Sequence, residues 1–411
     1  MAVSLFGLLI PAGTAGGSPS TVASTVAPVA ACTNTTKLDS WPLVQLARQT
    51  IAFPAEETSL GVVAPAARAG YGGILLFGTS APTTLGAQLT SLRRDVPHNL
   101  GLIVMTDEEG GGVQRMPNLV GSMPWASQMG AAWAPPRIKR VAQAVARKML
   151  LNGVDTDLAP VLDVDGRHVE PGQQDPDGLR SFSGVTSVVT ADGVAFMEGM
   201  IAGGVVPVIK HFPGLGGVSQ NTDDGPAHTL RWKTLERVAL PPFEAAIKAG
   251  APALMVSNAS VPGFTSLPAS LSPRVVRELR GPLGFKGLIV TDSLSAGAIA
   301  DPPLSLSVPE ASVDALVAGD NMVLFGSSGT TSGDLGVAAS TVSAIVAAVN
   351  DRELSKSVLV NAVAQVLAAK KIHLCPPAQP ARPPARPTQS PARPTQSPAP
   401  KAVLVDRPRS D

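Results

Sequence analysis

Short apolar runs recur eight times along the central part of the chain, and segments of helical character separate them. The runs are almost continuously apolar, as in strands that are buried on both faces of a parallel sheet. A strand followed by a helix, repeated about eight times, predicts an α/β fold of the (β/α)8 or TIM barrel type, in a single domain. A doubly wound open sheet is the alternative, but no G-x-G-x-x-G follows an early strand. The predicted strands lie at 49–53, 73–77, 102–106, 155–159, 205–210, 253–257, 288–291 and 321–325, and predicted helices include 136–151, 235–248 and 342–350.

The composition agrees with a folded domain and excludes several classes of protein. Hydrophobic residues make up 44% of the 411 residues and charged residues 15%, so the chain has enough apolar surface to bury. The net charge of +1 argues against nucleic acid as a partner, because that function needs a basic face. We find no apolar run of about 18 residues and expect no membrane-spanning helix.

The two ends of the chain differ in composition from its middle. Residues 1–31 combine an apolar start with a small, Thr- and Ser-rich stretch, which resembles a secretory signal and linker. Residues 376–411 are Pro-rich and contain the heptapeptide PARPTQS twice, at 384–390 and 391–397, which predicts a disordered tail. We therefore expect a barrel domain at 32–375 in a secreted or cell-envelope protein.

Only two cysteines, Cys32 and Cys375, are present, and they bracket the predicted domain. In an exported protein this placement favours one disulfide that ties the ends of a closed barrel together. Two alternatives remain open. Val29-Ala30-Ala31-Cys32 can be read as a lipobox, with Cys32 lipidated, or the two thiols are unrelated and free.

Polar residues directly follow several predicted strands, where the catalytic residues of a barrel are expected. Asp107 begins an acidic, Gly-rich segment, and a carboxylate there can bind sugar hydroxyls or a metal. Arg180 lies in an irregular loop and is a candidate cation for a ligand, or a surface residue. Lys210 and His211 are difficult to explain by packing, and a Lys there also admits a Schiff-base aldolase. Asp292 is a candidate nucleophile or base, or the N-cap of the next helix.

Together these segments resemble the catalytic barrel of family 3 glycoside hydrolases, especially the single-domain bacterial β-N-acetylglucosaminidases. The resemblance spans roughly residues 38–374, and the pieces occur in the order of the family. They are DEEGGGVQRM at 107–116, RSFSG at 180–184, KHFPGLG at 210–216 and IVTDSLSAGAI at 289–299.

The resemblance implies a retaining β-glycosidase, with Asp292 as the nucleophile that forms a covalent glycosyl-enzyme. Five residues would bind the sugar in the innermost subsite, and neither a metal nor another cofactor is required. The chemistry is consistent with the residue types, since a retaining enzyme needs an ionised carboxylate and a proton donor. The five residues are Asp107, Arg115, Arg180, Lys210 and His211.

The chain departs from the family pattern at the expected proton donor. The relatives carry PGHG and then an Asp-Ser-His triplet whose His is the acid/base, whereas here Leu215 stands in the first motif and the triplet reads Asn221-Thr222-Asp223. Three explanations remain open. Asp223, or its neighbour Asp224, acts as the acid/base with a pKa raised by burial; His228 takes the role; or the protein is a weak or inactive relative that binds glycans.

The departure also leaves the substrate open. An amino-sugar glycan of cell-wall type, cleaved by a β-N-acetylhexosaminidase, is the first prediction. A β-glucosidase-like enzyme is the alternative, although such relatives usually take the acid/base from an additional domain. We expect a carbohydrate as the partner and a monomeric protein.

Overall fold

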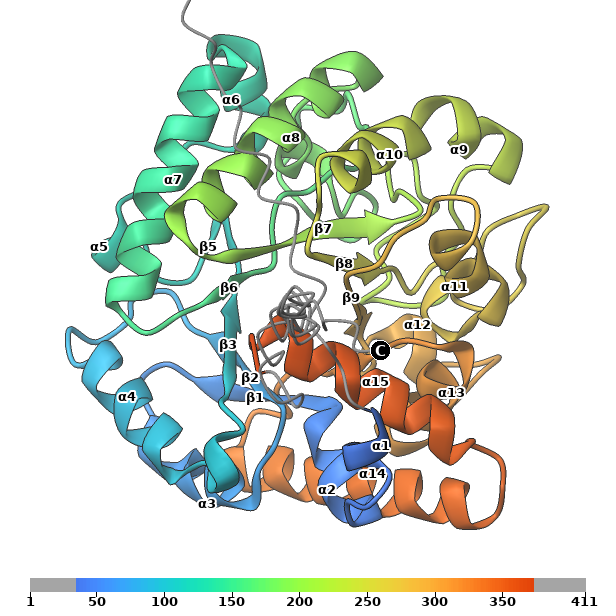
Figure 1. Cartoon of the computed structure of the whole chain (residues 1–411). Helices are drawn as coiled ribbons and strands as arrows, with labels where there is room; N and C mark the ends of the chain where they lie inside the picture. The colour runs from blue at the N-terminus through green and yellow to red at the C-terminus, as the bar shows by residue number, and fades with distance from the viewer. Residues whose placement is uncertain (1–34, 373–411) are drawn as a thin grey trace, which may run out of the picture. The chain divides into compact units, whose positions relative to one another are not determined.

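The computed structural model describes residues 35–372, and its centre is a closed barrel of eight parallel strands (Figure 1). The predicted (β/α)8 fold is therefore confirmed. A short hairpin of β4 (Glu108–Gly110) and β5 (Val113–Gln114) follows the third barrel strand. The barrel strands are β1 (Ile51–Glu56), β2 (Gly73–Phe77), β3 (Ile103–Thr106), β6 (Thr156–Asp157), β7 (Val206–Phe212), β8 (Ala253–Val256), β9 (Leu288–Ser293) and β10 (Met322–Leu324).

The barrel closes where its first strand meets its last. Ile51 of β1 pairs in parallel with Val323 of β10, while Ala52 of the same strand pairs with Gly73 of β2. All eight predicted strands form, with shifts of a few residues. The first begins at Ile51, because residues 49 and 50 end the preceding helix and its C-cap.

Helices surround the barrel (Figure 1). They are α1 (Thr35–Leu38), α2 (Leu43–Gln49), η1 (Leu60–Val63), α3 (Ala64–Ala69), α4 (Leu85–Asp95), η2 (Pro97–Asn99), α5 (Pro117–Val120), α6 (Ala126–Ala132), α7 (Pro135–Leu151), η3 (Gly178–Arg180), α8 (Thr186–Gly203), α9 (Trp232–Val238), α10 (Leu240–Lys248), η4 (Ala269–Leu271), α11 (Pro273–Arg280), α12 (Gly297–Ala300), α13 (Val308–Ala318), α14 (Thr331–Asn350) and α15 (Lys356–Ala369).

The predicted helix at 235–248 is wrong as one element. It is interrupted at Ala239, and α10 starts anew with Pro241 and Pro242 in its first turn. Proline lacks a backbone N–H and clashes with the preceding turn, so it is tolerated at the start of a helix but breaks its interior.

Helix α14 has the length and mean hydropathy of a membrane span, although we expected no such helix from the sequence. Its buried residues include Val342 and Ile345, and it packs against α13, α2 and β1. Its apolar character is therefore explained by its place in the outer layer of the barrel.

The interior of the barrel is filled by side chains, and α15 closes its amino-terminal end. Val366 of α15 packs with Ala52, Ile103 and Val290 from three strands. The ammonium of Lys370, just beyond α15, donates to Gln49 Oε1 over 2.8 Å. At the opposite end of the barrel, the carboxyl ends of the strands lead into the loops, as in other barrels of this kind.

We predict that Phe243→Ala lowers the free energy of unfolding by roughly 3–5 kcal/mol, because it leaves a cavity behind β7. Phe243 is fully buried and meets the ring of Phe212 edge to face, with the ring centroids 5.4 Å apart. Urea denaturation measures the effect. Leu151→Ala, at a side chain that is 83% exposed, serves as the control and should change stability by less than about 0.5 kcal/mol.

Candidate active site

A cavity of about 610 Å³ opens at the carboxyl ends of the barrel strands. Glu56, Phe77 and Leu324, at the ends of β1, β2 and β10, contribute to its wall. Seven of the residues predicted for the site line it together: Asp107, Arg115, Arg180, Lys210, His211, Asp223 and Asp292.

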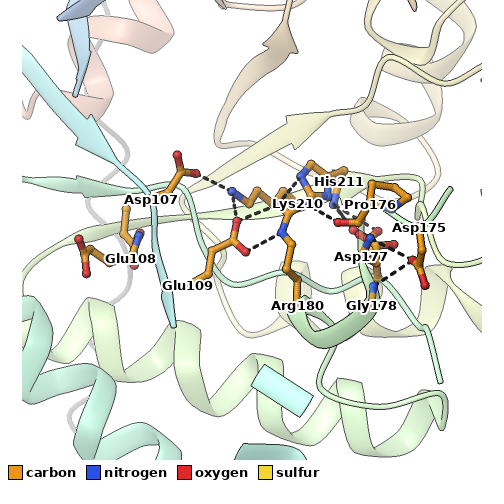
Figure 2. Close-up of polar contacts among 12 residues, drawn as sticks. Asp107, Glu108, Glu109, Asp175, Pro176, Asp177, Gly178, Arg180, Lys210 and His211 are labelled. Carbon is orange, nitrogen blue, oxygen red and sulfur yellow. Dashed lines mark hydrogen bonds and ion pairs between the residues drawn. The ribbon is translucent and has the colours of Figure 1, made fainter. Parts of the chain in front are cut away.

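The floor of this cavity is a network of buried charges around Lys210 (Figure 2). The Lys210 ammonium lies 2.8 Å from Asp107 Oδ1 and 2.6 Å from Glu109 Oε1. Its side chain is 3% exposed, so the two carboxylates replace the water that it has lost. The network joins the end of β7 to the segment that follows β3.

Charge pairing overcomes burial at each member of this network. Burial alone would raise the pKa of both carboxyls. The cations Lys210 and Arg115 nevertheless lower the pKa of Asp107, and Arg180 and Lys210 lower the pKa of Glu109. Burial likewise opposes the charge on Lys210, yet Asp107 and Glu109 raise its pKa. The site is therefore ionised and fixed before any ligand arrives.

Arg180 forms a bidentate ion pair with Glu109 in the floor of the cavity. Its Nε and Nη2 each donate to a Glu109 carboxylate oxygen over 2.8 Å, and Nη1 donates to the Pro176 carbonyl over 2.9 Å. Arg115 lies further out, with Nη2 3.4 Å from Asp107 Oδ2. Glu108 points away from Lys210 and accepts the backbone N–H groups of Arg115 and Met116 (Figure 2).

His211 is held by a buried acid behind it. Its Nδ1 lies 2.6 Å from Asp163 Oδ2, and Nε2 lies 3.4 Å from Arg180 Nη2. Because the arginine nitrogen can only donate, this geometry favours an accepting Nε2 and a proton on Nδ1 that faces Asp163.

A second buried acid, Asp177, lies close to both His211 and Asp163. One potential ligand atom from each of Asp163, Asp177 and His211 lies within 4.8 Å of the others. Among the described residues no N–H or O–H group donates to a carboxylate oxygen of Asp177, and the Asp163 carboxylate lies within hydrogen-bond reach of it. Burial, followed by the charge of Asp163, raises the pKa of Asp177 well above its usual range. A proton on Asp177 removes the repulsion between the two carboxylates.

The donor set of this trio fits a proton better than a metal ion. A metal bound at Nδ1 would displace the hydrogen bond to Asp163 and move the ring proton to Nε2. That proton would then face the N–H of Arg180, and two donors repel.

Asp292 and Asp223 reach the cavity from two different loops that are joined by backbone hydrogen bonds. Asp292 lies near the end of β9, and its Oδ1 accepts the backbone N–H of Ser293. Shortly after it, Gly297 N–H donates to the Asp223 carbonyl over 3.0 Å. A Cβ at Gly297 would lie 2.9 Å from that carbonyl oxygen, so only glycine permits the approach.

The pKa of Asp223 depends on burial and on the charged residues around its carboxyl. Asp223 is exposed to solvent, although it lines the cavity and has protein atoms around its carboxyl. Burial first, and the negative charge of Asp292 second, raise the pKa of Asp223, although the charge of Arg180 opposes them. The neighbouring Asp292 thus favours the protonated form of Asp223.

The other two predicted candidates for the acid/base lie elsewhere. Asp224 and His228 are exposed, as Asp223 is, but neither of them is among the residues that line the cavity. The ring of His228 turns toward the Thr229 carbonyl, 3.2 Å away. Leu215 does line the cavity, and its backbone N–H donates to Asp163.

Three residues of the site were not assigned from the sequence: Glu109, Asp163 and Asp177. Glu109 lies in the acidic segment 107–109, where the sequence singles out only Asp107. Asp163 comes six residues after the end of β6, whereas Asp292 lies within β9, so Asp163 lacks the strand-end signal that marks Asp292. The cysteines predicted to pair, Cys32 and Cys375, and the segments 1–31 and 376–411 lie outside the described residues.

The fold and this site define a barrel of the glycosidase class, with carboxylates and cations gathered where the strands end. The model of the "Glycosyl hydrolase family 3 N terminal domain" matches residues 57–369. The chain belongs to glycosyl hydrolase family 3.

Individual relatives agree with this family. The chain is 33% identical over 265 residues to an uncharacterized secreted glycosyl hydrolase of Arthroderma benhamiae, covering 60% of this chain and 73% of the relative. It is 34% identical over 234 residues to the β-hexosaminidase LpqI of Mycobacterium tuberculosis, covering 55% of this chain but only 58% of that protein. The crystal structure of a β-N-acetylhexosaminidase from Beutenbergia cavernae matches with a TM-score of 0.70 and 30% identity, over 81% of this chain and 99% of that one.

We predict that Asp177→Asn flattens the dependence of stability on pH. A raised pKa means that the folded state holds this proton more tightly than the unfolded state. Stability from Asp177 is therefore present at pH near 4 and is lost as pH rises toward the folded-state pKa, by at most about 1.4 kcal/mol per pH unit. Asparagine cannot titrate, yet its amide can still donate to Asp163. Urea denaturation from about pH 4 to 8 compares the two proteins, and parallel curves would contradict the prediction.

Proposed function

We propose that the protein is a retaining β-N-acetylhexosaminidase that uses Asp292 as nucleophile and Asp223 as acid/base. The observation that carries the proposal is the placement of these two carboxyl groups on one cavity, next to a fixed set of cations. A retaining glycosidase needs this pair, typically about 5–5.5 Å apart, on either side of the scissile bond.

The reaction follows in two displacements. A carboxylate oxygen of Asp292 attacks C1 of the sugar and forms an ester, while the C1–oxygen bond of the leaving group breaks and Asp223 gives its proton to that oxygen. Asp223, now a carboxylate, then takes a proton from water. The water oxygen attacks C1, frees Asp292, and leaves the sugar with its original anomeric configuration.

The charged floor is suited to binding the hydroxyl groups of the sugar whose C1 reacts. Asp107 accepts hydrogen bonds, whereas Lys210, Arg180 and Arg115 donate them, and charge-assisted bonds are stronger than neutral ones. His211 adds an accepting Nε2. Because Asp107, Glu109 and Asp292 offset the charges of Lys210, Arg180 and Arg115, the cavity favours a neutral sugar over an anionic one.

The amino-sugar specificity and the location rest on the relatives. Several relatives are named β-hexosaminidase, β-N-acetylhexosaminidase or β-N-acetylglucosaminidase, which supports an N-acetylhexosamine as the substrate. One relative is named a secreted glycosyl hydrolase, which supports export of this chain to the cell envelope or the medium. A carbohydrate is the partner that we propose, and a monomer remains our expectation.

A glycan-binding barrel without turnover is the second candidate. It is favoured by Leu215 in the place of the histidine of the family motif and by the position of His228 away from the cavity. It predicts saturable glycan binding with no release of product.

We predict that Asp292→Asn lowers the release of nitrophenol from nitrophenyl β-N-acetylglucosaminide by roughly 10³-fold or more, because an amide cannot form the ester. Asp301→Asn, at an exposed position in the following segment, is the matched control. Trapping with a fluorinated sugar should add its mass to the peptide that contains Asp292. No turnover by the unaltered protein on a panel of aryl β-glycosides would remove the enzyme proposal in favour of the binding barrel.

We predict that Asp223→Ala has an effect that depends on the leaving group. A nitrophenolate leaves with little help from an acid, so its first step should survive, whereas release of a poor leaving group such as methanol should fall by roughly 10²-fold or more. Asp224→Ala and His228→Ala are measured beside it. A larger, leaving-group-dependent loss in either one would move the acid role to that residue, and equal loss on both substrates would argue against Asp223.

A further inference from the structure

Helix α7, in the outer layer of the barrel, carries a row of positive charges on the face that it turns to solvent (Figure 1). The helix contains five Lys and Arg residues but no Asp or Glu. Its opposite face, which includes Ile138, Val145 and Met149, is buried, and the helix packs against α8. We call the four exposed cations of the outer face the basic stripe: Arg137, Arg140, Arg147 and Lys148.

The charges of the basic stripe are not compensated by acids. Within residues 35–372, no carboxylate forms an ion pair with any of its four members. Lys139, on a neighbouring face of α7, does pair, with Glu198 of α8 over 2.6 Å. The Arg137 guanidinium lies 4.2 Å from the centre of the Trp133 ring, and Lys148 donates to a backbone carbonyl over 2.9 Å. Both contacts leave the positive charge in place.

Helical spacing places these charges in one line. Arg140 follows Arg137 by three residues, and Arg147 follows Arg140 by seven, so the three lie on one side of the helix. Leu151, four residues further along, continues the same line. A flat surface can therefore contact the basic stripe and the end of the helix at the same time.

Exposed aliphatic side chains lie at the end of the stripe. Leu150 and Leu151 end α7, and Ile201 lies near the end of the neighbouring α8, with exposed fractions of 40%, 83% and 41%. We call these three residues the apolar tip. A Cβ at Gly204, directly after α8, would lie 2.8 Å from Leu150 Cδ1, so the two helix ends are in contact. Adjacent large apolar side chains that remain exposed indicate a surface that binds a partner or a membrane.

We propose that α7 binds the anionic surface of a phospholipid bilayer, with the basic stripe on the phosphate groups and the apolar tip inserted among the lipids. Lys and Arg combined with exposed Leu are typical of helices that lie at a membrane surface. Anionic lipids attract the cations, and the aliphatic side chains gain by leaving water. A soluble polyanion would match the stripe but leave the tip in water, so a bilayer accounts for both features.

This mode of binding leaves the active-site cavity open. Helix α7 ends shortly before β6 begins, so the apolar tip lies at the amino-terminal end of the barrel. The cavity lies at the carboxyl ends of the strands, and none of its lining residues belongs to α7. A bilayer at the tip would therefore not cover the cavity. The inference stands apart from the proposed function, since no residue of the cavity takes part in it.

The test is co-sedimentation of the full chain with vesicles of phosphatidylcholine, with and without phosphatidylglycerol. The variant Arg140→Gln/Arg147→Gln should lower the partition coefficient onto the anionic vesicles by roughly 10- to 30-fold, since each Lys or Arg near such a surface contributes about fivefold. Lys233→Gln/Arg237→Gln, at two exposed cations of α9, removes the same charge elsewhere and is the matched control. It should lower the coefficient by less than about twofold, because charges far from the bilayer are screened.

Leu151→Ser tests the apolar tip and should also lower binding to the anionic vesicles, without any change in charge. If this variant binds like the unaltered protein, and soluble polyphosphate binds as tightly as the vesicles at equal phosphate, the stripe takes a polyanion and the inference is overturned.

Three further results would overturn it. They are equal binding of the unaltered protein to vesicles with and without phosphatidylglycerol, equal loss in the α7 and α9 variants, and undiminished binding by an α7 variant that keeps the thermal midpoint of the unaltered protein. All the proteins compared carry the same terminal segments, so any binding by those segments cancels. If the double variant of α7 does not fold, Arg147→Gln alone is measured in the same way, with an expected loss of about fivefold.

Discussion

The buried ammonium of Lys210 is the constraint on which the site depends. Removing such a charge from water costs several kcal/mol, which only well-placed counter-charges offset. Asp107 and Glu109 supply them within 2.8 Å, and Arg180 in turn balances Glu109. Since these residues come from the end of β7, the segment after β3 and the loop after β6, the network holds three parts of the barrel rim in one arrangement. A sugar would therefore meet donors and acceptors that need no reorganisation.

The two carboxyl groups proposed for the chemistry are positioned by a different kind of bond. Backbone hydrogen bonds from Gly297 and Ala298 to the carbonyls of Asp223 and Thr222 fasten the loop after β7 to the segment after β9. These backbone bonds fix the course of the loop. The floor of the cavity is thus held by ion pairs, whereas Asp223, our proposed acid, is carried on a loop held by backbone hydrogen bonds.

The sequence predicts the barrel and the rim residues for the same physical reason. Strands buried on both faces must be apolar, so a polar residue at the end of such a run, such as Lys210 or Asp292, can be recognised in the sequence as a candidate site residue. The residues that contact them cannot be recognised in this way. Asp163 and Asp177 meet His211 only because the loop after β6 folds back, and no spacing along the chain encodes that path. For the same reason, the sequence could not separate Asp223 from Asp224, whose side chains differ in where they point rather than in type.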